Sequence, residues 1–278
     1  MLLGPAYGRG MSSPPRVEPD SGLAEVADRV WVTRRGPAGV VSTVVAGASG
    51  VLLVDAGWSV PAGDDLLAAV RRLGRGEPVG AVGTHAHPAH VGGNAALPPG
   101  VPVLLHDAAA AELRDRSAHV RTLSSVTAVD LGDRVVEVIH PGRGHTAGDL
   151  VVRVPDADVL VVGDLLRGDA PPSYGPDCWP LEWPASLDLV LQLLGDTGLA
   201  VPGHGDPMGR AAVEEQRDGT ATVAEAVREL AGRGVPADRA LAQGEADGSW
   251  PWPGQGLAEA VRRGYAQLPR SARQLPLA

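Results

Sequence analysis

Six side chains that could bind a transition metal stand out by their types and their spacing. Three histidines fall within six consecutive residues, and two further histidines and one aspartate each directly follow a glycine. Neutral imidazole nitrogens and carboxylate oxygens are common zinc ligands, and they also suit iron and manganese. The sequence therefore predicts a site for one or two metal ions, with zinc as the first choice and Fe or Mn as alternatives. The six predicted ligands are His85, His87, His90, His145, Asp164 and His204.

The spacing indicates how these residues could share the ions. In an extended segment alternate side chains point to the same side, so His85 and His87 can bind one ion together. His90 follows three residues later, past Pro88, and we expect it to point towards a neighbouring ion. The two carboxylate oxygens of Asp164 could bridge both ions. Any one of these histidines alone would more simply be a core or surface residue, so the prediction depends on all six groups occurring together.

Short apolar segments precede the ligands and are predicted to be strands. Ligand sites in open α/β sheets gather at the carboxyl ends of strands. A glycine lies between each segment and the ligand that follows it. We therefore expect four strand ends to bring the six groups to one place. The predicted strands are Val79–Val82, Val135–His140, Val159–Val162 and Leu199–Val201.

The rest of the pattern predicts sheets covered by helices. Strands and helices alternate first, strands cluster in the middle, and helices close the chain, which indicates an α/β fold. Further strands are predicted at Val40–Val45, Val51–Val54, Val101–Leu105 and Leu150–Val154. Helices are predicted at Pro61–Leu73, Asp107–Ala118, Ala185–Leu194, Ala211–Arg233, Pro236–Gln243 and Leu257–Leu268. We expect residues 21–278 to form one domain, behind a disordered tail (residues 1–20) that is rich in glycine, proline and serine.

Charge and composition disfavour several classes of partner. The net charge is -9, and all 24 basic residues are arginines scattered among acids, without the basic stripe of a nucleic-acid binder. The longest uncharged stretch, Gly36–Val54, holds four glycines and a proline, so no membrane helix is expected there. The N-terminus lacks a charged leader followed by a long apolar core. We therefore expect a cytoplasmic protein with a small-molecule substrate. The single cysteine, Cys178, permits no intrachain disulfide.

The order and spacing of five motifs make the chain resemble the metallo-β-lactamase-fold hydrolases, from about Val40 to Pro207. The resemblance implies an αβ/βα four-layer sandwich with the metal ions in a cleft at one edge. Many members of this family are not β-lactamases, so the resemblance does not choose a substrate. The motifs are Leu53–Gly57, His85–Asn94, Gly144–Asp149, Gly163–Asp164 and Pro202–Gly205.

The resemblance also implies a role for each predicted ligand. Three histidines would hold the first metal ion, two would hold the second, and the aspartate would bridge both. In that order they are His85, His87 and His145, then His90 and His204, and then Asp164. Asp164 and His90 are candidate catalytic residues. So is Asp55, which is expected to orient a ligand from the end of its strand.

One position departs from the family pattern. The family usually carries an aspartate directly before the third histidine of this segment, and this chain has Ala89. That aspartate normally binds the second metal ion and helps to orient the attacking water. A methyl group cannot coordinate a metal, so we expect a weakened second site and an intact first site. The chain would then work with one metal ion, bind two ions with the second held weakly, or be inactive.

An aromatic loop follows the strand that leads to Asp164. The segment Pro171–Pro184 contains two of the six tryptophans and one of the three tyrosines. Loops at this position can form the wall of a cleft, so Tyr174, Trp179 and Trp183 are candidate substrate-pocket residues. The alternative is that they pack the loop onto the helices, and the sequence leaves both alternatives open.

Three functions fit these observations. The leading hypothesis is a zinc-dependent hydrolase of an ester, thioester, lactone or amide, because a bound metal lowers the pKa of water towards ~7. The second is a mononuclear non-haem iron oxygenase, similar to persulfide dioxygenases, that uses His85, His145 and Asp164. The third is a non-catalytic binding member of the fold, for which Ala89 is the main support.

Overall fold

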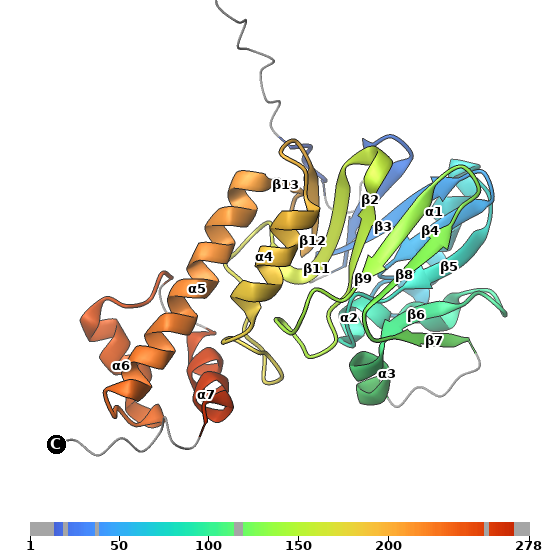
Figure 1. Cartoon of the computed structure of the whole chain (residues 1–278). Helices are drawn as coiled ribbons and strands as arrows, with labels where there is room; N and C mark the ends of the chain where they lie inside the picture. The colour runs from blue at the N-terminus through green and yellow to red at the C-terminus, as the bar shows by residue number, and fades with distance from the viewer. Residues whose placement is uncertain (1–13, 19–21, 37–38, 114–118, 253–255, 270–278) are drawn as a thin grey trace, which may run out of the picture.

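The computed structural model describes residues 14–18, 22–36, 39–113, 119–252 and 256–269. Within them, strands pair edge to edge in the order β7-β6-β5-β4-β3-β12-β11-β10-β9-β8, with β1 and β2 continuing from β3. The chain forms two layers of strands with helices on their outer faces, and a helical unit follows at the C-terminal end (Figure 1). The α/β fold class expected from the sequence is confirmed.

The first layer is built from the N-terminal half of the chain. Strands β4, β5, β6 and β7 pair in parallel, and β2, β3 and β4 pair antiparallel. These strands are β1 (Ala24–Ala27), β2 (Val30–Arg35), β3 (Val40–Gly47), β4 (Gly50–Val54), β5 (Pro78–Val82), β6 (Val103–His106) and β7 (Val120–Leu123). Their helices are α1 (Val60–Leu73), α2 (Pro88–Val91) and α3 (Asp107–Leu113), with a short 3-10 turn η1 (Asn94–Ala96) after α2.

The second layer is mostly antiparallel. Strands β8 to β11 form a meander, and β11 pairs in parallel with β12. The strands are β8 (Val126–Asp130), β9 (Val135–Ile139), β10 (Val151–Val154), β11 (Val159–Arg167), β12 (Leu199–His204) and β13 (Met208–Gly209), with the 3-10 turn η2 (Pro155–Ala157). Helices α4 (Trp183–Leu193) and α5 (Arg210–Gly232) cover it. The two layers are joined where His204 of β12 pairs with Val40 of β3.

The period of two along the strands explains why two layers form. On β3, Val41 and Val45 belong to a core shared with β10 and β11, whereas Val44 belongs to a core shared with α1. Successive side chains of a strand point to opposite faces, so an apolar strand buries both faces at once. The shared core lies between the sheets, which gives the αβ/βα order of layers.

A helical unit follows the sandwich. Helices α6 (Ala237–Asp247) and α7 (Leu257–Gln267) pack against α5 around Val227, Leu230 and Val261. The indole rings of Trp250 and Trp252 lie against Gly244 of α6 and Gly219 of α5, where an added Cβ would collide with them. None of the described helices combines the length and the apolar character that crossing a membrane requires.

The structure differs from the sequence prediction in several strands and in the N-terminal tail. Strands β1, β2, β7, β8 and β13 were not predicted, and β11 continues five residues past its predicted end at Val162 to Arg167. In the predicted disordered tail, residues 1–13 and 19–20 lie outside the described part. Val17, however, is 2% exposed in the core between the sheets, and its N–H donates to Asp206. The tail prediction is therefore wrong at this residue, because an apolar side chain there finds a packing site.

Candidate metal centre

Three predicted ligands form a compact group of imidazole rings. The ligand atoms of His85, His87 and His145 all lie within 4.8 Å of one another. His145 Nε2 is 3.0 Å from His87 Nδ1, and the rings of His85 and His87 meet edge to face. His85 and His145 are buried, and His87 is partly exposed. These are the three histidines expected to hold the first metal ion.

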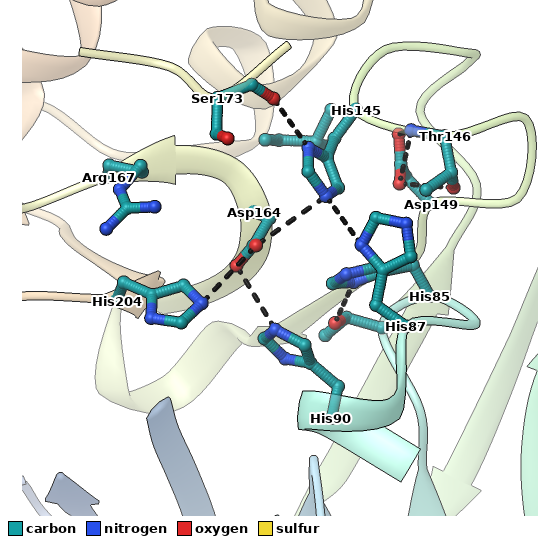
Figure 2. Close-up of polar contacts among 12 residues, drawn as sticks. His85, His87, His90, His145, Thr146, Asp149, Asp164, Arg167, Ser173 and His204 are labelled. Atoms are coloured by element: carbon teal, nitrogen blue, oxygen red, sulfur yellow. Dashed lines mark hydrogen bonds and ion pairs between the residues drawn. The ribbon is translucent and has the colours of Figure 1, made fainter. Parts of the chain in front are cut away.

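Asp164 connects this group to the other predicted ligands. Its Oδ2 lies 3.6 Å from His145 Nε2 and 3.4 Å from His204 Nε2. Its Oδ1 lies 3.3 Å from His90 Nε2. The ligand atoms of His85, His90 and Asp164 also lie within 4.8 Å of one another. A single carboxylate therefore faces both groups, as a bridging ligand would (Figure 2).

Strand ends and the loops after them position most of these side chains. His85 and His87 follow β5, and α2 then carries His90. His145 lies in the loop between β9 and β10, and His204 is the last residue of β12. The four segments meet at the edge of the sandwich where the two sheets join, as expected from the sequence.

Asp164 differs from the prediction because it lies inside a strand and not beyond its end. The β11–β12 register shifts around Gly163, whose φ of 55° lies in the left-handed region that favours glycine. The strand then continues to Arg167. On the neighbouring strand, a Cβ at Gly203 would overlap Asp164 Oδ1 and press on His90. Glycine at both positions therefore lets the carboxylate turn into the centre.

The ring of His85 is oriented through Thr84 and Asp55. The Thr84 hydroxyl donates to Asp55 Oδ2 at 2.8 Å, because a carboxylate can only accept. Having one proton, that hydroxyl must accept from His85 Nδ1, 3.0 Å away. Nδ1 therefore carries the proton, and the lone pair of His85 is on Nε2.

His90 is oriented by the same aspartate. His90 Nδ1 lies 2.7 Å from Asp55 Oδ2, and the Thr84 N–H donates to Asp55 Oδ1 at 2.8 Å. Asp55 has a φ of 58°, which is uncommon for a non-glycine residue and tolerated best by Asp and Asn. Asp55 thus contacts His90 directly and His85 through Thr84, as a residue that orients metal ligands would.

Two groups that were not predicted orient the remaining rings. His87 Nε2 donates to Asp177 Oδ2 at 3.0 Å, and His145 Nδ1 donates to the Ser173 carbonyl at 3.1 Å. Both acceptors belong to the loop between β11 and α4. Carboxylate and carbonyl partners of this kind fix the tautomer of a metal-binding histidine. Asp177 lies in the Pro171–Pro184 segment, but nothing in its sequence spacing connects it to His87.

These hydrogen bonds leave the Nε2 lone pair of His85 facing inward, as a metal ion requires. The Nε2 atoms of His85 and His90 and Oδ1 of Asp164 are buried and form no hydrogen bond among the described residues. His145 Nε2 and His87 Nδ1 lie 3.0 Å apart and share one hydrogen bond, whose donor depends on the tautomers of the two rings. Buried polar atoms without a hydrogen-bond partner are rare in folded proteins, so the unpartnered atoms of this centre suit a cation. The donor set, three to five imidazoles with one carboxylate, fits a transition metal.

Burial and neighbouring charges set the protonation of the metal-free centre. Burial lowers the pKa of His85 well below its usual value and that of His145 to about 4. Burial also opposes charge on His90, but Asp55 and Asp164 outweigh it and raise the pKa of His90 to about 10. Burial opposes ionisation of Asp164, yet the charge of His90 keeps the pKa of Asp164 well below its usual value. His90 therefore holds a proton that a second metal ion must displace.

A tight turn supports His145 from the other side. The carboxylate of Asp149 accepts from the N–H of Thr146 at 2.9 Å and from its hydroxyl at 2.7 Å. Burial raises the pKa of Asp149 to about 7, and the bonds from Thr146 counteract this only in part. These two residues hold the loop that carries His145 (Figure 2).

Ala89 lies beside His90 on the short helix α2. Its methyl group offers no ligand atom. The second group therefore has His90, His204 and the shared carboxylate of Asp164 as its donors.

The three aromatic pocket candidates have different positions. Trp183 has no exposed surface, donates from Nε1 to the Leu165 carbonyl, and contacts the ring of His145 edge to face. Tyr174 is 5% exposed and contacts Trp183. Trp179 is half-buried under the guanidinium of Arg143, 3.7 Å from its ring centroid. For Trp183 and Tyr174 the structure therefore favours the packing alternative.

A family model described as the metallo-beta-lactamase superfamily matches residues 35–207. This range is more than half of the chain, and the chain belongs to that superfamily. The resemblance inferred from the five motifs is thereby confirmed. Membership also supports a divalent metal and hydrolytic chemistry at the level of the family.

Individual relatives agree with this assignment. Metallo-beta-lactamase type 2 from Bacillus cereus is 31% identical over 162 residues, which are 56% of this chain and 63% of that protein. The match thus spans less than two thirds of that relative. A metallo-beta-lactamase from Pontibacter korlensis aligns with 70% of this chain and 98% of its own, at 25% identity and a TM-score of 0.63. A stereoselective inverting sec-alkylsulfatase from Pseudomonas sp. aligns with 88% of this chain and 50% of its own, at 17% identity and a TM-score of 0.73. The last likeness shows the fold alone.

Proposed function

We propose that this protein is a metal-dependent hydrolase whose main metal ion, zinc, is held by His85, His87 and His145. The substrate is a small molecule with an ester, thioester, lactone or amide bond. The net reaction adds water across the acyl bond and gives a carboxylic acid with an alcohol, thiol or amine. Two of the relatives above are named metallo-beta-lactamases, and β-lactams, which are cyclic amides, fall within this range.

The tautomers of the histidines are the observation that supports this proposal most. Each of these three rings donates its outward N–H to a fixed acceptor, namely Thr84 for His85, Asp177 for His87 and the Ser173 carbonyl for His145. Of the inward nitrogens, His85 Nε2 is buried and has no hydrogen-bond partner among the described residues, while His87 Nδ1 and His145 Nε2 lie 3.0 Å apart. Both nitrogens of a structural histidine normally find hydrogen-bond partners, so the bare Nε2 of His85 favours a metal ligand.

The residues of the centre have distinct roles in such a reaction. A zinc ion bound there would lower the pKa of a water ligand towards ~7 and would polarise an acyl oxygen. The charge of His90 keeps Asp164 ionised, and its carboxylate faces the centre, so it can accept a hydrogen bond from a water there and orient it. Asp55 and Thr84 hold His85 and His90 in place. Buried surroundings strengthen these electrostatic contacts.

We propose that the second site is the weaker one. Ala89 contributes no charge there, and a proton on His90 competes with the incoming ion. The working form then contains one tightly held ion, with partial occupancy of the second site at high metal concentration.

Metal content and hydrolysis, measured together, test the proposal. Protein purified without chelator is analysed by elemental mass spectrometry and assayed on esters, thioesters, lactones and β-lactams. We expect close to one zinc ion per chain in the wild type. In His85→Ala and in Asp164→Ala we expect both the zinc and the hydrolytic activity to be lost. His119→Ala, at an exposed position outside the centre, is the matched control. Unchanged metal content in both ligand variants would contradict the assignment.

The group formed by His85, His90 and Asp164, with His90 in place of the His145 expected from the sequence, favours a second candidate. Two histidines and one carboxylate with open positions are the ligand set of non-haem Fe(II) oxygenases. Iron in the purified protein, together with oxygen uptake and no hydrolysis, would move the oxygenase to first place. A zinc-containing protein that consumes no oxygen would exclude it.

A further inference from the structure

The loop between β11 and α4 holds both acceptors that orient the first metal group. Its Ser173 carbonyl bonds to His145, and its Asp177 carboxylate bonds to His87. The second carboxylate oxygen of Asp177, Oδ1, is buried and has no hydrogen-bond partner among the described residues. The position of this carboxylate therefore depends on the backbone that carries it. Whatever fixes the backbone at Asp177 and Cys178 also fixes the hydrogen bond to His87.

Helix α7 fixes that backbone. Arg263 Nε donates to the Cys178 carbonyl at 3.0 Å, and Arg263 Nη2 lies 3.5 Å from the Asp177 carbonyl. Gln267, one turn further along α7, donates from Nε2 to the same Cys178 carbonyl at 3.0 Å. Charged donors make the stronger hydrogen bonds, so the guanidinium is expected to dominate. Two side chains on one face of α7 thus hold two consecutive peptide units of the loop.

Helix α7 is itself rigidly supported. Gly264 lets it approach α5 closely, since a Cβ at this position would lie 2.7 Å from Val227 Cγ1. Val261 and Tyr265 are buried in the core of the helical unit, and the Tyr265 hydroxyl donates to the Val235 carbonyl at 2.8 Å. The loop also packs Leu181 against this core. The backbone of Arg263 and Gln267 is therefore held in place by the packing of α7 on α5.

We propose that Arg263 and Gln267 are positioning residues of the metal centre. They hold the backbone of Asp177 and Cys178 in place. This backbone keeps the Asp177 carboxylate bonded to His87, and that bond keeps the inward nitrogen of His87 directed at the first metal ion. The inference rests on the proposed function, because it requires metal at the first site. Helix α7 lies beyond residues 35–207, so this support comes from outside the segment that the family model matches.

The expected size of the effect follows from how many contacts separate each residue from His87. Removal of a residue that orients a metal-binding histidine typically weakens metal binding about 10- to 100-fold. Asp177→Ala is expected in that range. Arg263→Ala acts through Asp177 and is expected to weaken zinc binding by less, about 3- to 10-fold.

Zinc affinity of the full chain, measured by competition with a chromophoric chelator, tests the proposal. The comparison includes wild type, Arg263→Ala, Asp177→Ala and the double variant. Arg233→Ala is the matched control, because Arg233 pairs with Asp247 in the same helical unit and makes no described contact with the loop. Thermal unfolding of the metal-free proteins shows whether each variant folds. If Arg263→Ala does not fold, Gln267→Ala and Arg263→Lys, which keeps one donor, replace it.

The double variant separates positioning from general stability. If Arg263 acts through Asp177, then Arg263→Ala causes no further loss of affinity once Asp177 is already alanine. Equal further loss in both backgrounds, or wild-type affinity in Arg263→Ala, would overturn the inference. A wild-type chain that binds zinc, with no effect of Arg263→Ala, removes this inference alone. A wild-type chain that binds no zinc removes the proposed function together with it.

Discussion

Ala89 decides how much charge the second group of ligands carries. The other donors of this group are His90, which must first lose its proton, and His204. The carboxylate of Asp164 is shared with the first group. A divalent ion at this position would therefore meet less than one full negative charge of its own. Metal affinity depends on the number of deprotonated ligands, so the two sites should differ widely in affinity.

Restoring the carboxylate should fill the second site. In Ala89→Asp we expect zinc content to rise from about one towards two ions per chain, because the new carboxylate lies beside His90 and favours a cation. Elemental analysis at equal metal exposure measures this. Ala89→Asn, which has nearly the same size and no charge, should stay near one.

The same variant also separates the hydrolase from a binding protein. A large gain of hydrolysis in Ala89→Asp would identify the parent as an impaired hydrolase. If neither form hydrolyses a broad panel of substrates, the non-catalytic alternative gains. Unchanged stoichiometry would mean that the second site is limited by something other than this residue.

His90 should make the metal-free protein sensitive to alkali. Its pKa is raised from about 6.5 in the unfolded chain to about 10 in the fold. The folded state thus binds a proton that the unfolded state releases. This stabilisation is fully present below pH ~6.5 and is lost as the pH rises through ~10.

Thermal unfolding of chelator-treated protein between pH ~6.5 and ~10 measures this effect. We expect the melting temperature of the wild type to fall across this range. The fall should be smaller in His90→Gln, which keeps a polar side chain but cannot titrate. Parallel curves for the two proteins would show that His90 is not the titrating group. His87, whose pKa is raised by its bond to Asp177, contributes to both curves equally.

At the scale of elements, the parallel pair β11–β12 shapes the centre. Asp164 turns inward only because β11 shifts register at Gly163 and because β12 presents a glycine opposite the carboxylate. The sequence prediction ended this strand at Val162, since Gly163 followed by Asp164 is typical of a strand end. A strand that continues through an irregularity has no local signature, so the position of Asp164 inside a continuous strand could not be predicted.

Gly203→Ala should damage the metal centre from the backbone side. The added methyl group would overlap Asp164 Oδ1 and press on the ring of His90, so one of them must move. We expect loss of zinc affinity and a lower melting temperature, with the loss of affinity the larger relative change. Gly209→Ala, where a Cβ meets no atom within 4 Å, is the matched control. Wild-type zinc affinity in Gly203→Ala would show that the strand pair has room to adapt.

Strands were predictable where both of their faces are buried. The apolar runs of β3, β4 and β5 were identified because nearly every residue contributes to a core. Strand β8 alternates exposed and half-buried residues over five positions, at the edge of the sheet, and this short pattern resembles a loop. The six ligands were predictable from their types and spacing. Thr84, Asp177 and the Ser173 carbonyl were not, since packing and not spacing selects them.

At the scale of the whole molecule, the residues that form and support the metal centre are spread over most of the chain. Its orienting residues begin at Asp55, and the helix that holds the supporting loop ends at Gln267. The helical unit therefore supports the loop that orients the metal ligands, although α6 and α7 lie outside the family match. The sequence predicted its helices well, but their contacts with the Asp177 loop depend on how α7 docks against α5.

The hydrogen bonds from α7 to the Cys178 carbonyl impose an order of events during synthesis. A ribosome adds about 5–20 residues per second, so His204 is made seconds before Gln267. In that interval the nascent chain already contains every predicted ligand, but it lacks helix α7, which holds the loop that carries Asp177. A metal ion captured early would be held about 3- to 10-fold less tightly, until the C-terminal helices have left the ribosome and docked.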